Sequence, residues 1–203
     1  MENAYLLANE RRLTIKKSFS LNKLLGAKWT EEVQNLSSGK PAVFGLKSSD
    51  FDKNFPNQYL RQLKHVSVSF VLKEEKAADE IAAILTQTAN TTLIEPDKKG
   101  DEYLKKGGEE IPASIRRNLH AHQQIALSSQ EQEDGLGYSA GEWVYELMFH
   151  DGRYLHFEGT GAISEWTLEI PGTDFASSLK DAITDIKINL VYTALPKDRT
   201  LGS

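Results

Sequence analysis

The sequence predicts a mainly β protein, an antiparallel β-sandwich with short N-terminal helical segments. Three segments place large apolar residues at every second position: Val66–Leu72, Trp143–Phe149 and Ile186–Tyr192. Turn-forming Gly and Asp residues separate such segments, and no internal repeat or low-complexity linker interrupts them. Regularly spaced alternating strands between turns are typical of sandwich folds, and 203 residues suffice for one such domain.

The first forty residues combine helical and strand patterns. Residues Met1–Asn9 fit the last turns of a helix, with Ala4, Leu7 and Ala8 on one face. Alternation from Leu13 to Leu21 then predicts a half-buried strand, which Lys17 interrupts once. A second short helix is expected within Leu21–Leu36, with Thr30 as its N-cap.

The middle of the chain is less uniform. A short apolar piece, Ala42–Leu46, lies in a turn-rich region, and Val66–Leu72 predicts a strand with one core face and one polar face. The segment "ADEIAAILTQTAN" (78–90) fits either a helix or a buried strand, and propensity alone favours the helix. The lysine pairs at 98–99 and 105–106 alternate with acidic residues and indicate a solvated mixed-charge loop.

The C-terminal half reads as further strands. The segment "IRRNLHAHQQIALSS" (115–129) ends in a strand-like piece. Trp166, Leu168 and Ile170 alternate with polar residues, and large apolar residues also take every second position in 143–149 and 186–192. This alternation places Trp143 and Trp166 with the core.

Composition narrows the classes of partner. The formal net charge is −5 with no concentrated basic run, which argues against nucleic acid and against a membrane surface. There is no cysteine, so a disulfide framework and a thiolate metal site are excluded. The first residues lack the pattern of a signal peptide, and no stretch approaches a membrane span.

The densest cluster of chemically active side chains is "RYLHFEGTGAISEW" (153–166). Its glycines lack the Lys-Ser/Thr pair and the following helix of a phosphate-binding loop. We expect instead a structural corner formed by Arg153, Tyr154, Phe157, Glu158, Gly159 and Gly161. Arg153 and Glu158 are expected to pair across it.

Other motifs do not complete a catalytic or metal site. The Asp50-x-Asp52-x-Asn54 spacing resembles the start of a calcium loop, but Phe55 replaces the required Gly and Arg61 replaces the bidentate Glu. His120 and His122 would share one face of a strand without a third zinc ligand nearby. No Gly-x-Ser-x-Gly turn accompanies His150 and Asp151, so no catalytic residue, cofactor or metal is predicted.

Five blocks of sequence carry a family resemblance: "FPNQYLRQLKHVSVSF", "IRRNLHAHQQIALSS", "EDGLG", "FHDGRYLHFEGTGAISEWTLEIP" and "ITDIKINLVYTA". In order and spacing they resemble the C-terminal, B-component-binding domain of the A components of bacterial insecticidal toxin complexes (Tc toxins). The N-terminal segment "MENAYLLANERRLTIKKSFSL" is similar to the family's approach from its channel helices. The family usually has a Gly-His pair where this chain has Asn57-Gln58, and a proline where it has His156.

The resemblance implies a non-enzymatic docking domain of a secreted toxin. The A component would be a homopentamer whose channel mouth receives the B component's β-propeller, whereas the isolated domain is expected to be a monomer without membrane contact. Residues 1–25 would be the end of the channel helices and a linking strand, and residues 26–203 the binding domain. Residues 80–90 would form a strand. We expect the partner to contact Val144, Met148, Tyr154 and His156.

Two rival functions remain open from the residues alone. A carbohydrate-binding sandwich would stack a sugar on Trp143, Tyr154 or Trp166. A glycosidase would need a pair of carboxylates whose separation the sequence does not define.

Overall fold

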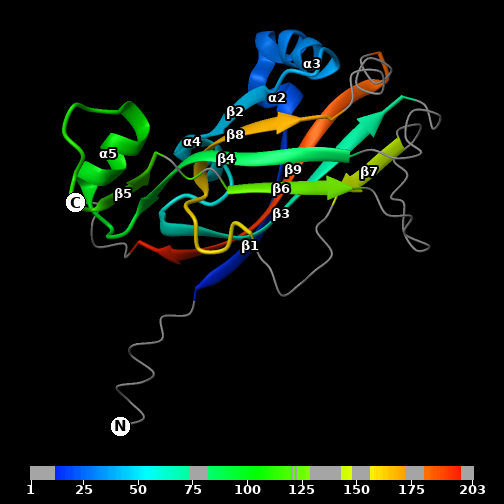
Figure 1. Ribbon diagram of the computed structural model, residues 1–203. Coiled ribbons are helices and arrows are strands. Elements are labelled where there is room, and N and C mark those ends of the chain that lie inside the picture. Colours follow the sequence, from blue (N-terminus) through cyan, green and yellow to red (C-terminus); the bar gives the residue numbers. More distant parts are fainter. Residues whose placement is uncertain are drawn as a thin grey trace.

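The computed structural model shows two antiparallel β-sheets packed face to face, with helices at their margins (Figure 1). It describes residues 12–73, 82–119, 121, 123–128, 143–147, 156–171 and 181–197, with only the backbone for Ser128 and 143–147. The predicted antiparallel sandwich is therefore confirmed. Met1–Asn9 and the histidines at 120, 122 and 150 lie outside the described residues.

Sheet I has the strand order β1-β9-β3-β7. Its strands are β1 (Leu13–Ser20), β3 (Gln58–Leu72), β7 (Trp143–Leu147) and β9 (Ile183–Pro196). The two long strands, β3 and β9, pair along almost their whole length. Sheet I is thus organised around a central pair that joins the first half of the chain to its end.

Sheet II has the order β2-β8-β4-β5, with β6 also paired to β4. Its strands are β2 (Ala42–Leu46), β4 (Ala82–Leu93), β5 (Ile115–Asn118), β6 (Gln123–Ser128) and β8 (Ile163–Glu169). Residues 82–93 are therefore a strand, as the family resemblance implied and helix propensity did not. Burial between two neighbouring strands overrides the local preference of a run rich in Ala and Leu.

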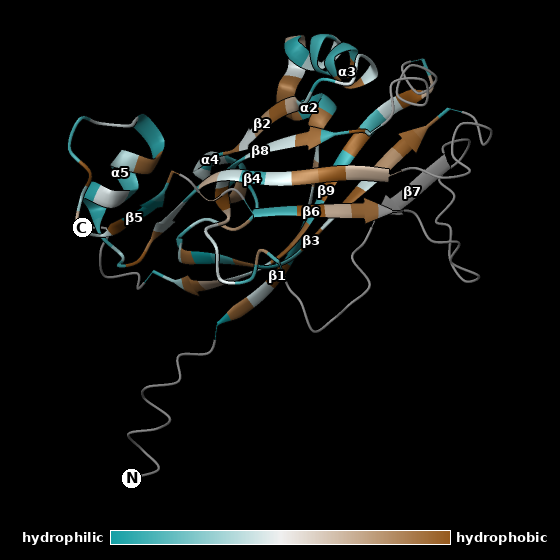
Figure 2. Ribbon diagram, viewed as in Figure 1, coloured by the Kyte–Doolittle hydropathy of each residue, from teal (hydrophilic) through white to brown (hydrophobic). Residues whose placement is uncertain are grey.

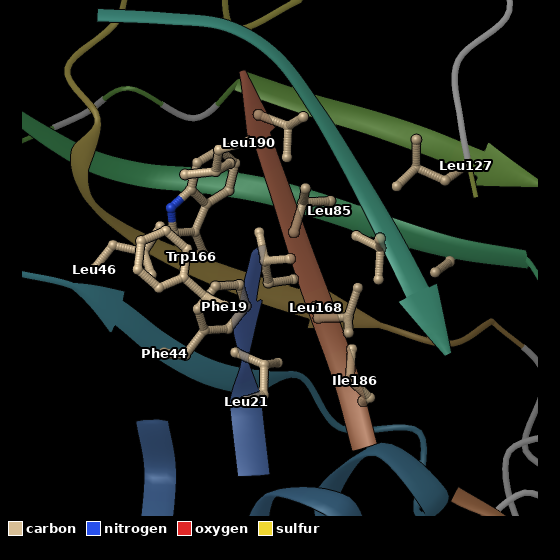
Figure 3. Close-up of a cluster of buried hydrophobic side chains, with 14 of the residues drawn as sticks. Phe19, Leu21, Phe44, Leu46, Leu85, Leu127, Trp166, Leu168, Ile186 and Leu190 are labelled. Carbon is tan, nitrogen blue, oxygen red and sulfur yellow. The ribbon is translucent and has the colours of Figure 1, made fainter. Parts of the chain in front are cut away.

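The core lies between the two sheets and is filled by the alternating apolar residues (Figure 3). Trp166 and Leu168 of β8 are completely buried, and so are Ile186 and Ile188 of β9. The Trp166 ring stacks on Phe44 at a centroid distance of 6.4 Å and receives the edge of Phe157 at 4.9 Å. The prediction that Trp166 belongs to the core is confirmed. The structure describes only the backbone of Trp143, so the same prediction for Trp143 is not tested.

The polar face predicted for β3 is buried rather than solvated. Ser67 and Ser69 are only 3% and 4% exposed. The side-chain amide of Asn189 donates to the hydroxyls of both serines, while its oxygen accepts a hydrogen bond from Ser18. Because these groups satisfy one another, a polar row can be buried on this face of the sheet.

Short helices close the margins of the sandwich. They are α2 (Leu21–Leu25), a 3₁₀ turn (Gly26–Lys28), α3 (Trp29–Ser37), α4 (Ser48–Asp52) and α5 (Lys98–Lys106). The predicted helical segment at 21–36 is present, but Thr30 lies inside α3 and is not its cap. The carboxylate of Glu32 on α3 accepts the exposed backbone N–H of Val43, which protects the edge strand β2.

The predicted mixed-charge loop at 98–106 is instead helix α5, which is mostly hydrophilic in Figure 2. Asp97 caps it by accepting the backbone N–H of Gly100 and the hydroxyl of Ser114. A Cβ on Gly100 would lie 2.5 Å from both Leu93 and Ser114, so the helix start is packed directly onto the end of β4. The Asp97 cap and the close contact at Gly100 stabilise a helix in this charged segment and fix its start against β4. The four lysines of the helix remain exposed.

Capping makes the stability contribution of Asp97 depend on pH. Hydrogen bonds from Gly100 and then Ser114 hold the pKa of Asp97 below its usual value of 3.8. We predict that the wild type is more stable than Asp97→Asn at neutral pH, and that this advantage disappears as the pH falls through the lowered folded-state pKa. Urea unfolding at a series of pH values measures it. Glu95→Gln, an exposed position two residues earlier, controls for loss of charge; an advantage unchanged down to strongly acidic pH would contradict the prediction.

Candidate functional site

Residues 156–162, called the corner below, connect the two sheets at one side of the sandwich. The corner enters β8 directly and is the yellow loop that runs into it in Figure 1. Gly159 donates its N–H to the carbonyl of Leu63 at 2.9 Å, and Leu63 donates to Thr160 at 2.8 Å. Ala162 donates to Arg61 at 3.0 Å. The corner, which continues into a strand of sheet II, therefore pairs with β3 of sheet I.

The corner is also tied to β4 of sheet II. The backbone N–H of Gly161 donates to the side-chain oxygen of Asn90, and the Asn90 amide donates to Gln87 at 2.9 Å. Both amide side chains are buried, Gln87 completely. The sequence analysis did not predict that Asn90 and Gln87 hold the corner. Their only indication in the sequence is that two amide side chains occur within a mostly apolar strand.

The two glycines of the corner have different roles. Gly159 has a φ of 78°, a conformation that favours glycine. Gly161 has no such torsion, but a Cβ there would lie 2.6 Å from Thr92 Oγ1 and still closer to the carbonyl oxygen of Thr91. One glycine therefore permits the turn, and the other permits the close approach of two backbones.

The remaining side chains of the predicted corner divide between core and surface. Phe157 is buried against Trp166, whereas Glu158 is exposed. Arg153 and Tyr154 lie outside the described residues, so their contacts with the corner stay a prediction.

Of the four residues expected to contact the partner, only His156 has a described side chain. It is exposed, one residue before the buried Phe157. Val144 is described only as part of the backbone of β7, which pairs with β3 at the margin of sheet I. Met148 and Tyr154 lie outside the described residues. The grouping of these four residues as one partner surface therefore stays a prediction.

A buried charge cluster adjoins the corner at α4. The guanidinium of Arg61 is 4% exposed, pairs with Asp52 at 2.6 Å and donates to the carbonyl of Phe55 at 3.0 Å. It also lies over the ring of Phe51, 5.5 Å from the centroid. The two acidic residues that resembled a calcium loop therefore have structural roles: Asp52 pairs with Arg61, and Asp50 accepts the backbone N–H of Lys47 at the start of α4.

Lys17 completes the cluster from β1. Its ammonium lies over the rings of Phe19 and Phe51 and donates to the carbonyl of Asp50. Desolvation lowers the pKa of Lys17, while the charge of Asp50 opposes that shift. The single interruption in the alternation of β1 is thus a lysine whose ammonium lies over two aromatic rings.

These features stabilise a fold and supply no catalytic constellation among the residues described. In that part of the chain, no three acidic or histidine side chains are grouped to hold a metal ion. None of its helices is long and apolar enough to cross a bilayer.

Two comparisons with known proteins, by family model and by sequence identity, point to the same family of toxin subunits. Residues 1–194 match the model of the Tc toxin complex TcA C-terminal TcB-binding domain. The chain is 33% identical over 196 residues to toxin subunit YenA2 of Yersinia entomophaga, covering 96% of this chain and 13% of that subunit. It thus spans a small part of the curated relative's length.

A solved structure shows the same fold. The cryo-EM structure of Morganella morganii TcdA4 matches 96% of this chain and 8% of that one, with a TM-score of 0.54 and 23% identity. The cryo-EM structure of Yersinia pseudotuberculosis TcaA-TcaB matches 95% of this chain and 10% of that one, at 20% identity and a TM-score of 0.49.

The packing of Gly161 gives a first prediction for this site. Gly161→Ala places a methyl group against the Thr91 carbonyl, and the backbone must shift to accept it. We expect the free energy of unfolding to fall by about 1–3 kcal/mol, measured by urea denaturation. Gly45→Ala is the matched control, because its Cβ would meet only a carbonyl at 3.8 Å. Equal effects of the two changes would contradict close packing at the corner.

The buried guanidinium of Arg61 gives a second prediction for this site. Asp52→Asn removes the charge that compensates Arg61, so we expect a loss near the lower end of ~3–5 kcal/mol, because the Asp52 side chain is 29% exposed. Lys53→Ala breaks only the exposed pair with Asp50 and should cost no more than about 1 kcal/mol. Thermal or urea unfolding of both variants measures the difference. An Asp52→Asn protein as stable as Lys53→Ala would show that Arg61 does not need its partner.

Proposed function

The chain belongs to the family of Tc toxin complex TcA C-terminal TcB-binding domains, and from this membership we propose that it binds the B component of a toxin complex as a non-enzymatic docking domain. The match of the family model to residues 1–194 carries this proposal. The B component's β-propeller would dock at the mouth of a translocation channel formed by five A components. The full-length toxin would be secreted.

The domain boundaries follow from the same proposal. Residues 1–25 would link the preceding channel region to the binding domain at 26–203. Part of this link is built into the sandwich, since β1 pairs with β9 and contributes Phe19 to the core. Such pairing supports a stiff connection between the channel and the docking domain.

The corner supports a structural role within this function. Its hydrogen bonds to β3 and β4 hold residues 156–162 in place while His156 remains exposed beside them. A partner surface is most effective when its residues are already ordered, because binding then costs less conformational entropy. We therefore retain His156 as a partner contact, together with Val144, Met148 and Tyr154.

The carbohydrate-binding alternative loses one of its three aromatic residues. Trp166 is completely buried between Phe44 and Phe157 and cannot stack on a sugar. No contact among the described residues favours this alternative over docking.

The proposal predicts weak binding by one copy. Several domains around one channel mouth contact the same partner, so later contacts form at high effective concentration. We expect the isolated chain to be monomeric by light scattering and to bind a cognate B component at least ~10²-fold more weakly than the full A component does. Titration of both proteins against the same B component measures the ratio. Equal affinities would contradict the avidity argument, and no binding by either protein would contradict the docking function.

A further inference from the structure

One half-buried glutamine of β3 joins the start of β1 to the corner. The side-chain oxygen of Gln62 accepts a hydrogen bond from the guanidinium of Arg12 at 2.6 Å. The side-chain NH₂ group of Gln62 donates to the backbone carbonyl of Gly159 at 3.0 Å. Arg12 directly precedes β1 within the proposed link at 1–25, so one side chain contacts both the link and the corner.

The strand order of sheet I shows how these distant segments meet. Thr14 of β1 is in register with Thr193 of β9, which is in register with Gln62 of β3. Because β9 lies between β1 and β3 (Figure 1), the Arg12 side chain reaches across β9 to meet Gln62. The contact therefore joins the edge of sheet I to its interior pair of strands.

Gln62 also lies at the point where the corner pairs with β3. Gln62 and Gly161 form an isolated antiparallel bridge, and the residues on either side of Gln62 make the backbone bonds to the corner described above. The register of β3 against β9 shifts both before and after the pair Gln62 and Leu63. Because these irregularities interrupt the ladder on both sides, side-chain bonds matter more to the position of this short segment than elsewhere in β3.

The chemistry of the amide fixes its orientation. An arginine side chain only donates hydrogen bonds, and a backbone carbonyl only accepts them. The Gln62 oxygen must therefore face Arg12 while its NH₂ group faces Gly159, and the reverse orientation would break both bonds. A charged donor at the amide oxygen also strengthens the NH₂ group as a donor, since hydrogen bonds in series polarise one another. The two bonds thus support each other.

We propose that Gln62 is a positioning residue through which the link sets the order of the corner. This inference rests on the proposed docking function, because it concerns the corner that carries the exposed His156. When Arg12 is held in place, Gln62 donates to Gly159 and the tip of the corner is ordered. When Arg12 is displaced, the amide turns toward water and the tip loosens. An A component whose link is fixed would therefore lose less conformational entropy at the corner on binding.

Amide hydrogen exchange, followed by NMR on the 203-residue chain, tests the coupling. Arg12→Ala should speed exchange of the Gly159 N–H by ~2- to 10-fold, the range expected when one exposed hydrogen bond is lost. Lys16→Ala, which removes another exposed cation of β1, is the matched control and should leave this rate unchanged. Exchange at Leu168 of β8 should be the same in all variants. An unchanged Gly159 rate in Arg12→Ala, or equal acceleration at Leu168, would overturn the proposal.

Two changes at Gln62 distinguish coupling from a merely structural contact. Gln62→Glu still accepts from Arg12 but cannot donate to Gly159, so Gly159 exchange should be fast although the pairing with Arg12 is kept. Gln62→Leu removes both bonds, so adding Arg12→Ala to it should have no further effect on Gly159. A slow rate in Gln62→Glu, or an undiminished effect of Arg12→Ala in the Gln62→Leu protein, would show that Arg12 does not act through this amide.

Binding by the full A component separates this proposal from the docking function. Its affinity for the cognate B component should fall ~2- to 10-fold in Arg12→Ala and stay unchanged in Lys16→Ala. Equal affinity of Arg12→Ala and wild type would contradict a positioning role in docking. If the wild-type A component did not bind at all, the docking function would be wrong, whereas the exchange rates would still decide the coupling.

Discussion

The close approach of the Gly161 backbone to the Thr91 carbonyl is the constraint on which the joint between the two sheets depends. There, one stretch of chain hydrogen-bonds to β3 on one side and to Asn90 of β4 on the other. A side chain at Gly161 would displace it from both. The edge-to-face contact of Phe157 with Trp166 then follows, because the corner directs the Phe157 ring into the core beside the first buried residues of β8.

The position of the charge cluster follows from the same joint. Ala162 takes the Arg61 carbonyl as its acceptor, so the corner fixes the backbone from which the guanidinium projects. From that point the side chain crosses the Phe51 ring to reach Asp52. A buried cation held in this way gives little net stabilisation, since desolvation offsets much of the attraction. Its effect is to define one position for α4, because any other position would leave the charge unpaired.

The parts of the fold that depend on one strand were predictable, and those that depend on two distant segments were not. Trp166, Leu168 and Ile170 alternate with polar residues, and their burial follows from that period alone. The start of β3 was missed because its bulge interrupts the alternation before Val66. Burial of Ser67 and Ser69 depends on Asn189, more than a hundred residues away. The ion pair of Arg61 likewise depends on the position of α4 against β3, which the sequence does not define.

In the candidate site, the glycines of the sequence indicated a corner. Only the structure shows that Gly161 is needed for a close backbone contact and Gly159 for a positive φ.

One departure from the resembling family has a physical explanation in this fold. Where that family usually has glycine, the chain has Asn57, and its φ of 58° lies in the left-handed region. Asparagine enters this region more readily than other residues with a side chain, so the replacement preserves the turn into β3. The Asn57 carbonyl also accepts the N–H of Lys197, which ties the end of β9 to the start of β3. Lys197 in turn pairs with Asp101 on α5. The turn, the last strand and α5 are therefore linked in series, and a partner that contacted α5 would act on the same backbone that positions Arg61 and the corner.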